Sequence, residues 1–323
     1  MAEKFNYSSG ALSRHAPGRL GTARQTSMAK SAVESPYRIL CRQNEYSVTN
    51  PPSINPSPQP VLLDRFRAVL SRDGAAAAQS LPTRLSADPT HGDELFYVPF
   101  EHMNLGARLV IVGITPGPNQ IALAYNSVQA GLNGGLDDES ILARAKKVGS
   151  FGGPQMRPKL LKMLQAFGFP ELLEIGDAAE LWESASVFLH ATSVVPHAAI
   201  RNSKPFAGSF DDVLESPIMK ASFERDFAAT LPLLSSEALY VALGPTPLDA
   251  LDWCAARGLL QREQVMGAFA HPSNNGGSQV AVYLGEKSPG DLHPKDPVRH
   301  RVAWLLAAAA RMRQSVADHR AIA

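Results

Sequence analysis

Two short polar loops, far apart in the chain, hold the residues best suited to chemistry. The first, residues 113–120, reads Gly-Ile-Thr-Pro-Gly-Pro-Asn-Gln, and the second, residues 271–277, reads His-Pro-Ser-Asn-Asn-Gly-Gly. The first offers backbone N–H groups in a tight turn. The second offers an imidazole, His271, which can donate a hydrogen bond to an oxygen or an anion. Together they suggest a site that binds a polar ligand.

Neither loop is specific when taken alone. The first lacks the Gly-Lys-Ser/Thr ending of a phosphate-binding loop and the GxGxxG pattern of a dinucleotide site, so it could be an ordinary strand-to-helix turn. The second could be a turn in which Ser273 or Asn274 bonds to the backbone.

The elements that position these loops are apolar runs alternating with helical patterns. Residues 108–113 and 265–270 are apolar runs typical of strands covered on both faces, and each leads into one of the loops. We predict two further strands at 187–190 and 239–244. We predict helices at 61–75, 119–132, 137–148, 158–167, 178–184, 210–234 (interrupted near Pro217), 247–257 and 298–313.

This alternation predicts an α/β fold with a largely parallel sheet. If the strands before the two loops are parallel neighbours, both loops open on one edge, where open α/β proteins bind ligands. We expect one domain at 61–315, a tail at 316–323 and a disordered, weakly basic, Pro-rich arm at 1–60. That arm carries seven Lys or Arg against three acids.

Composition excludes several classes of protein. The formal net charge is +1, so nucleic-acid contact by the core would need a local basic patch. Cys41 and Cys254 form no CxxC pair, so we expect free thiols and no zinc site, iron–sulfur cluster or other cofactor. No run of about 18 apolar residues exists and the N-terminus lacks an apolar leader, so we expect a cytoplasmic protein that is not bound to membranes.

As a pair, the loops resemble the two signature motifs of the uracil-DNA glycosylase superfamily. Residues 113–117 are similar to the Gly-x-Asn-Pro-Gly segment of its mismatch-specific and single-strand-selective members, and residues 271–273 to its His-Pro-Ser segment. The resemblance covers roughly residues 90–310. It implies a three-layer α/β/α sandwich around a four-stranded, largely parallel sheet. It also implies a monofunctional DNA glycosylase that flips a base out of DNA and hydrolyses its N-glycosidic bond, leaving an abasic site.

The resemblance implies roles for particular residues. His271 would stabilise the departing base anion, and Thr115 aligns with the residue that positions water, with Asn119 as an alternative. For the base pocket we expect Gly113, Gly117, Gln120, Tyr125, His190, Thr192 and Ser193, and for the DNA backbone Ser273, Asn274, Asn275, Arg157, Lys159, Arg201 and Lys204.

Three departures from the family pattern shape the expected substrate. Thr115 stands where the family has Asp, Asn or Glu, and residues 190–193 replace the asparagine that reads uracil. Residues 274–278 are small and polar where other members carry a bulky wedge. We therefore expect a modified or damaged base as substrate, in DNA repair or in defence against phages with modified DNA, and a monomer that binds DNA.

Two other functions remain open from the sequence. The chain could be a DNA-binding module of the same fold that has lost catalysis and recognises altered bases or abasic sites. It could also be an α/β hydrolase or nucleotide-binding enzyme that does not act on DNA and matches the motifs by chance.

Overall fold

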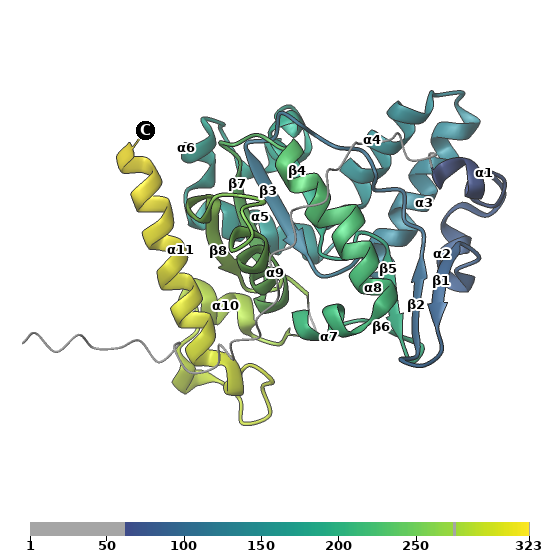
Figure 1. Cartoon of the computed structure of the whole chain (residues 1–323). Coiled ribbons are helices and arrows are strands. Elements are labelled where there is room, and N and C mark those ends of the chain that lie inside the picture. The colour runs from purple at the N-terminus through teal and green to yellow at the C-terminus, as the bar shows by residue number, and fades with distance from the viewer. Residues whose placement is uncertain (1–61, 274–275, 323) are drawn as a thin grey trace, which may run out of the picture. The chain divides into compact units, whose positions relative to one another are not determined.

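A parallel four-stranded sheet forms the centre of the fold. The computed structural model describes residues 62–273 and 276–322, and Figure 1 shows the arrangement of their elements. The strand order is β4-β3-β7-β8, and all three pairings are parallel. The strands are β3 (Leu109–Gly113), β4 (Leu189–Ser193), β7 (Leu239–Leu243) and β8 (Val265–Phe269). The predicted α/β class with a parallel sheet is confirmed.

The two loops of interest follow β3 and β8. These strands are parallel but not direct neighbours, because β7 lies between them. Since all four strands run the same way, both loops still open at the carboxyl edge. Two inter-strand spacings separate their strands, roughly 10 Å. Every residue of β3 and β8 is buried, as expected for strands covered on both faces.

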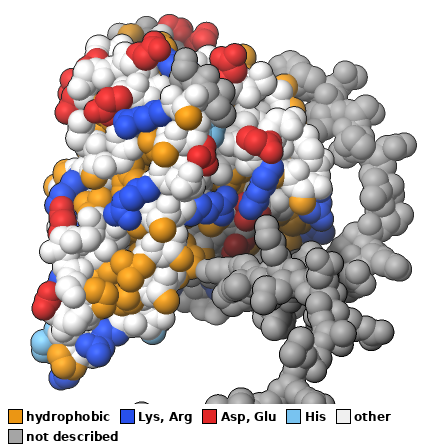
Figure 2. Space-filling model, turned by 90° about the vertical axis from the view of Figure 1, so that its left-hand side faces the viewer, with side chains coloured by type: hydrophobic (Ala, Val, Ile, Leu, Met, Phe, Trp, Pro, Cys, Tyr) orange, Lys and Arg blue, Asp and Glu red, His pale blue; other side chains and the backbone are white. Residues whose placement is uncertain are grey.

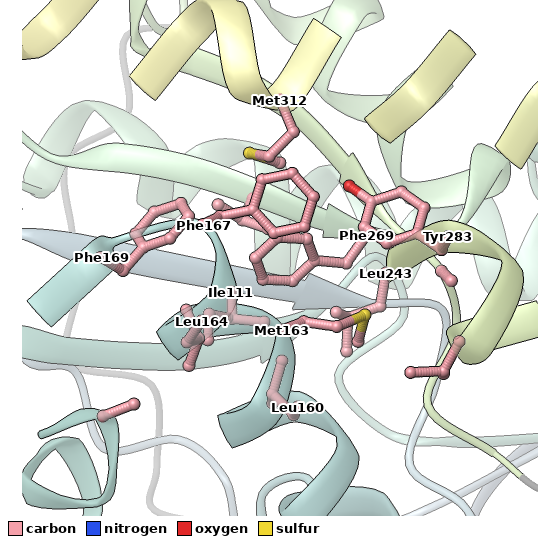
Figure 3. Packing of buried hydrophobic residues seen from close by; sticks show 14 of the residues in the cluster. Ile111, Leu160, Met163, Leu164, Phe167, Phe169, Leu243, Phe269, Tyr283 and Met312 are labelled. Atoms are coloured by element: carbon pink, nitrogen blue, oxygen red, sulfur yellow. The ribbon is translucent and has the colours of Figure 1, made fainter. Parts of the chain in front are cut away.

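One face of the sheet is covered by a large apolar cluster. Figure 3 shows its aromatic centre, where the rings of Phe167, Phe269 and Tyr283 meet with centroids 5.3–6.1 Å apart, and Met312 of the C-terminal helix lies against them. The covering helices are α5 (Met156–Ala166), α6 (Phe169–Leu173), α10 (Gln279–Leu284) and α11 (Val302–Ile322). Buried aromatic area of this kind contributes much of the stability of a core.

The other face is covered by a broken helical segment and one further helix. Ser216 caps the second helix of the segment by accepting a hydrogen bond from the Met219 N–H at 3.4 Å, and Pro217 occupies its first turn. The predicted interruption near Pro217 is therefore confirmed. The covering elements are α7 (Phe210–Glu215), α8 (Pro217–Ser222), the π-helical turn η5 (Phe223–Phe227), the 3₁₀ turn η6 (Ala228–Leu233) and α9 (Pro245–Ala255).

A second, antiparallel sheet was not predicted. Its order is β1-β2-β5-β6, and a third apolar cluster joins it to four helices. The strands are β1 (Arg84–Asp88), β2 (Asp93–Phe96), β5 (Ala198–Arg201) and β6 (Lys204–Pro205). The helices are α1 (Leu62–Asp73), α2 (Ala77–Ser80), α3 (Pro118–Asn133) and α4 (Asp138–Gly149).

Several boundaries differ from the prediction. The helix expected at 178–184 is a 3₁₀ turn, η3 (Ala178–Trp182), and β4 is preceded by another, η4 (Ser186–Phe188). Residues 316–322, predicted as a tail, continue α11, and Val316 is buried against the core. Short 3₁₀ turns complete the unit: η2 (Gly74–Ala76), η7 (Arg262–Gln264), η9 (Pro289–Asp291) and η10 (Arg299–Arg301).

The chain divides into a segment 1–53 and a compact unit 54–323. The predicted arm at 1–60 lies outside the described residues. Within the part that the structure describes, no helix is long and apolar enough to cross a membrane. Cys254 is a free, buried thiol.

Candidate functional site

His271 stands just beyond β8, at the carboxyl edge of the parallel sheet. Its Nδ1 accepts a hydrogen bond from the Ser273 N–H at 3.3 Å, so the hydrogen of the neutral ring lies on Nε2. Burial, aided by the positive charge of Arg301, lowers the pKa of His271 to about 4. At neutral pH the side chain is therefore an uncharged imidazole with a fixed tautomer and one donor, Nε2–H.

Two residues missed by the sequence analysis hold this loop in place. Gln279 Nε2 donates to the His271 carbonyl at 2.6 Å, and Arg301 Nη1 donates to Gln279 Oε1 at 3.4 Å. The Arg301 Nε is buried and has no hydrogen-bond partner among the described residues. Arg301 therefore places a positive charge beside His271, which favours an anion at that position. Nothing in the local sequence signals this role, because Arg301 lies far beyond the motif.

Thr115 connects the loop after β3 to the second sheet. Its hydroxyl donates to the His197 carbonyl at 2.7 Å and accepts from the Ala199 N–H at 2.9 Å. The single hydroxyl hydrogen is therefore used inside the fold. The prediction that Thr115 positions water is not supported by this geometry, which gives the residue a structural role. Gly117 has φ −88°, so this turn does not use the positive φ that glycine permits.

Asn119 and Gln120 differ in their surroundings, although they are adjacent in the first turn of α3. Gln120 is buried, accepts from the Phe151 N–H at 3.0 Å and lies 3.7 Å from the Met156 sulfur. Its amide holds the core together and is not a base-pocket group. Asn119 is exposed, and its side chain has no hydrogen bond to another described residue. Of the polar side chains in this loop, the Asn119 amide is the one whose hydrogen-bonding capacity remains unused.

Three other predicted base-pocket residues belong to the interior. Tyr125 is fully buried, donates to the Tyr97 carbonyl at 2.5 Å and lies 2.6 Å from the Thr83 hydroxyl, so it cannot stack on a flipped base. Gly113 lies against the Phe151 ring, where an added Cβ would come within 3.0 Å. Ser193 is buried beside Gly113.

Some of the predicted DNA-backbone residues are bonded within the fold, and others lie nearer the surface. Arg157 Nη2 donates to the carbonyls of residues 147, 148 and 150, and its guanidinium lies 5.1 Å from the Trp182 ring centroid, so it closes the end of α4. Arg201 is bound to acidic side chains of its own fold. Lys159 is half-buried on α5, Lys204 is exposed on β6, and Ser273 is half-buried. Asn274 and Asn275 lie outside the described residues.

His190 and Thr192 line a cavity of about 680 Å³ beside the edge strand β4. The His190 Nδ1 accepts from the Asn104 N–H at 3.3 Å, and burial holds the pKa of His190 well below its usual value. The wall is largely apolar, and its apolar side chains include Leu85, Leu95, Val98, Phe100, Met103 and Leu142.

Two further ionisable groups missed by the sequence analysis face this cavity. Burial raises the pKa of the Glu101 carboxyl to about 7, and burial lowers the pKa of the Lys146 ammonium to about 7. The carboxylate comes from the loop after β2 and the ammonium from α4, so no local spacing in the sequence joins them.

A search for similar proteins adds one relative. The uncharacterized protein YoxB of Bacillus subtilis (strain 168) is 30% identical over 207 residues, which are 64% of this chain and 80% of that protein. The chain belongs to the YoxB family. No family model and no solved structure matches it.

The surface of this YoxB-family member carries charges of both signs. Figure 2 shows one face, where Lys and Arg side chains stand among acidic and hydrophobic ones across the described part of the surface. The relative is uncharacterized, so membership of the YoxB family indicates no reaction. The chemistry must be inferred from the side chains at the edge of the sheet. They offer a neutral imidazole donor, a nearby guanidinium and an exposed amide.

The neutral histidines predict acid lability in this YoxB-family member. Burial lowers the pKa of His197, like that of His271, to about 4, whereas an unfolded histidine titrates near 6.5. Because the unfolded chain binds these protons first, stability is lost as pH falls from 6.5 towards 4. At pH 5, each of these two histidines lowers the free energy of unfolding by about 2 kcal/mol. The pKa of Glu101 is raised in the folded state, so the folded chain binds this proton first. This group therefore raises the free energy of unfolding by about 2 kcal/mol over the same pH range.

We therefore expect the free energy of unfolding to fall by at least roughly 2 kcal/mol between pH 7 and pH 5, because His190, whose pKa burial also lowers, adds to the loss. Urea unfolding at pH 7, 6 and 5 measures it. The His197→Gln variant should lose about 2 kcal/mol of that pH dependence. An unchanged slope in this variant would show that His197 is not held neutral.

Proposed function

We propose that this chain is a monofunctional DNA glycosylase that acts on a modified or damaged base and leaves an abasic site. The observation that carries the proposal is the placement of His271, a neutral donor held at the carboxyl edge of the parallel sheet, on the same edge as the loop after β3. Ligands bind at this edge in open α/β sheets.

The chemistry that His271 can supply matches base release. As the N-glycosidic bond breaks, the base departs with negative charge, and a preorganised Nε2–H would stabilise that charge. Donors of this kind are worth about 3–4 kcal/mol. The low pKa of His271 keeps the ring neutral, so it acts by hydrogen bonding. The positive charge of Arg301 beside it favours the same anion.

The water nucleophile needs a second group. Since the Thr115 hydroxyl hydrogen is bound to the His197 carbonyl, the exposed Asn119 amide is the better candidate to orient water. An amide orients water without acting as a general base, so leaving-group stabilisation at His271 would supply most of the catalysis.

The same observation on Thr115 favours a second candidate function. A fold that has given its water-positioning residue a structural role could bind altered bases or abasic sites in DNA without releasing a base. This binding module would show salt-dependent DNA affinity and no turnover.

The test is incubation of the full chain with single- and double-stranded oligonucleotides carrying uracil, other deaminated bases and modified cytosines, followed by alkali. Strand breaks at the altered base, lost in His271→Ala, support the glycosylase. Binding without strand breaks supports the binding module. Neither binding nor breaks across the panel would overturn both.

The chain offers a matched control for this variant. His293 is also followed by proline, and its Nδ1 also accepts a hydrogen bond from the backbone N–H two residues later, at 3.2 Å. This turn is exposed and does not follow a strand of the parallel sheet. His293→Ala therefore removes the same kind of side-chain hydrogen bond at a position away from the sheet edge, and it should leave base release unchanged.

A further inference from the structure

A second, smaller pocket is lined by residues of α4 and of the segment that enters β4. Its volume is about 290 Å³, and we call it the α4 pocket. Three cationic side chains of α4 line it, Arg144, Lys146 and Lys147, whereas no Asp or Glu among the described residues does. The α4 pocket is therefore a concave site whose fixed charges are all positive.

The fold leaves much of the hydrogen-bonding capacity of these cations unused. Arg144 is exposed and makes no hydrogen bond or ion pair with another described residue. The Lys147 ammonium donates to two neutral oxygens, a backbone carbonyl at 3.0 Å and the Ser186 hydroxyl at 3.2 Å. The buried Lys146 ammonium donates to the His102 carbonyl at 2.6 Å and keeps two further hydrogens. Donors for an oxyanion therefore remain on all three side chains.

The histidines around the α4 pocket respond to the same excess of positive charge. Burial, and then the charge of Lys146, lower the pKa of both His102 and His190. Glu101 and Glu139 are the acids that act on these three groups, and neither lines the pocket. The helix dipole favours cations near the end of α4, but it does not account for their position around one pocket with two histidines. A bound anion would account for it.

We propose that the α4 pocket binds a dianionic phosphate group, either of a small phosphomonoester or of inorganic phosphate. A tetrahedral dianion can accept from a guanidinium and two ammonium groups at once, whereas a carboxylate has two oxygens and a single charge. The apolar side chains of Leu181, Trp182 and Leu189 would contact the organic part of a monoester. Since ligand pockets usually exceed about 300 Å³, a volume of about 290 Å³ indicates a small ligand.

This inference does not depend on base release. The His271 loop follows β8 at one edge of the sheet, whereas β4 forms the opposite edge. The α4 pocket contacts the first three residues of β4, 189–191, at the amino end of that strand. It shares Lys146 and His190 with the cavity beside β4. A DNA backbone offers phosphodiesters with one charge each, so a preference for a dianion distinguishes this site from a DNA contact.

The experiment is isothermal titration of the full chain with phenyl phosphate, glycerol 3-phosphate, inorganic phosphate and dimethyl phosphate, at pH 8 and matched ionic strength. Dimethyl phosphate is the matched ligand, because it is a phosphodiester with a single charge. We expect the dianions to bind at least about tenfold more tightly, since they gain a charge-assisted hydrogen bond. Tighter binding of either monoester than of inorganic phosphate identifies the monoester as the ligand, and equal binding identifies phosphate itself.

Proton uptake provides a second measurement. Burial lowers the pKa of the Lys146 ammonium to about 7, so most of this group is neutral at pH 8. A dianion beside it raises the pKa of Lys146, and the complex therefore takes up a proton. A phosphomonoester is already fully ionised at pH 8, because its second pKa is about 6. Titrations in two buffers with different ionisation enthalpies measure the uptake.

Two variants test the assignment to these residues. Arg144→Gln and Lys147→Gln should each weaken binding of phenyl phosphate by about tenfold, whereas the exposed control Lys295→Gln should not. Because both side chains are exposed, these variants should unfold at the same urea concentration as the wild type. Base release should be unchanged in Arg144→Gln, so the pocket and the proposed glycosylase are tested separately.

Three results would overturn the inference: equal affinity for phenyl phosphate and dimethyl phosphate, full binding by Arg144→Gln, or binding without proton uptake at pH 8. A chain that binds the dianion and releases no base would contradict the proposed glycosylase and leave the α4 pocket assignment standing.

Discussion

Replacing His271 by alanine is expected to lower the rate constant of base release by about 100- to 1,000-fold, the effect of removing one preorganised donor from a developing anion. The donor acts where charge develops, so the loss should fall on kcat with KM little changed. The reason lies in the geometry: the Ser273 N–H occupies Nδ1, which leaves Nε2–H as the one ring donor.

Single-turnover release from the best oligonucleotide of the substrate panel measures this effect. His293→Ala carries the same change in a similar but exposed turn and should match the wild type. His271→Gln, which restores an amide donor, should recover part of the rate. A His271→Ala variant whose KM rises while kcat is unchanged would show that His271 only binds the ground state.

The parallel sheet could be predicted because its strands carry their signal locally. Residues 109–113 and 239–243 are continuous apolar runs, and each is followed by a helix with proline in its first turn. The antiparallel sheet has no such signal. Residues 84–88 and 93–96 contain three acids and an arginine in nine positions. They are strands because β1 pairs with β2, and β2 pairs with β5, about a hundred residues later. Tertiary context decides such segments, and periodicity does not.

The candidate site shows the same limit. His271 was identified because its loop follows a strand directly. The roles of Thr115, Gln120 and Tyr125 could not be predicted, since each is set by a hydrogen bond to a residue distant in sequence. A hydroxyl in a loop and a tyrosine on a helix are compatible with function or with packing until their partners are known.

The cavity beside β4 could be predicted only in part, through His190 and Thr192. Glu101, Lys146 and His190 come from a loop, a helix and a strand, and their spacing matches no motif. The resemblance singled out His190 for a base pocket, whereas nothing in the sequence singled out Glu101 or Lys146. Only the fold shows that a carboxylate and an ammonium are buried around the same hollow without pairing.

Arg201 provides the second large effect, on stability. Its guanidinium binds both oxygens of Asp93 at 2.6 and 3.0 Å, and the Asp93 side chain is completely buried. Arg201→Met should therefore lower the free energy of unfolding by about 3–5 kcal/mol, because it leaves a buried carboxylate without its partner. Urea unfolding at pH 7 measures the loss. Arg84→Met, which breaks the exposed ion pair between Arg84 of β1 and Glu94 of β2 in the same sheet, should cost no more than about 1 kcal/mol.

A double variant separates this structural role from the phosphate contact that the sequence suggested. Arg201→Met with Asp93→Leu should recover most of the lost stability, because replacing both members of a buried pair by apolar groups is often neutral. If Arg201 contacted a phosphate, the refolded double variant would bind DNA with a salt slope shallower by about 0.9. An unchanged slope with recovered stability assigns Arg201 to the fold. If the Arg201→Met single variant were as stable as the wild type, the ion pair between β5 and β2 would not contribute to stability.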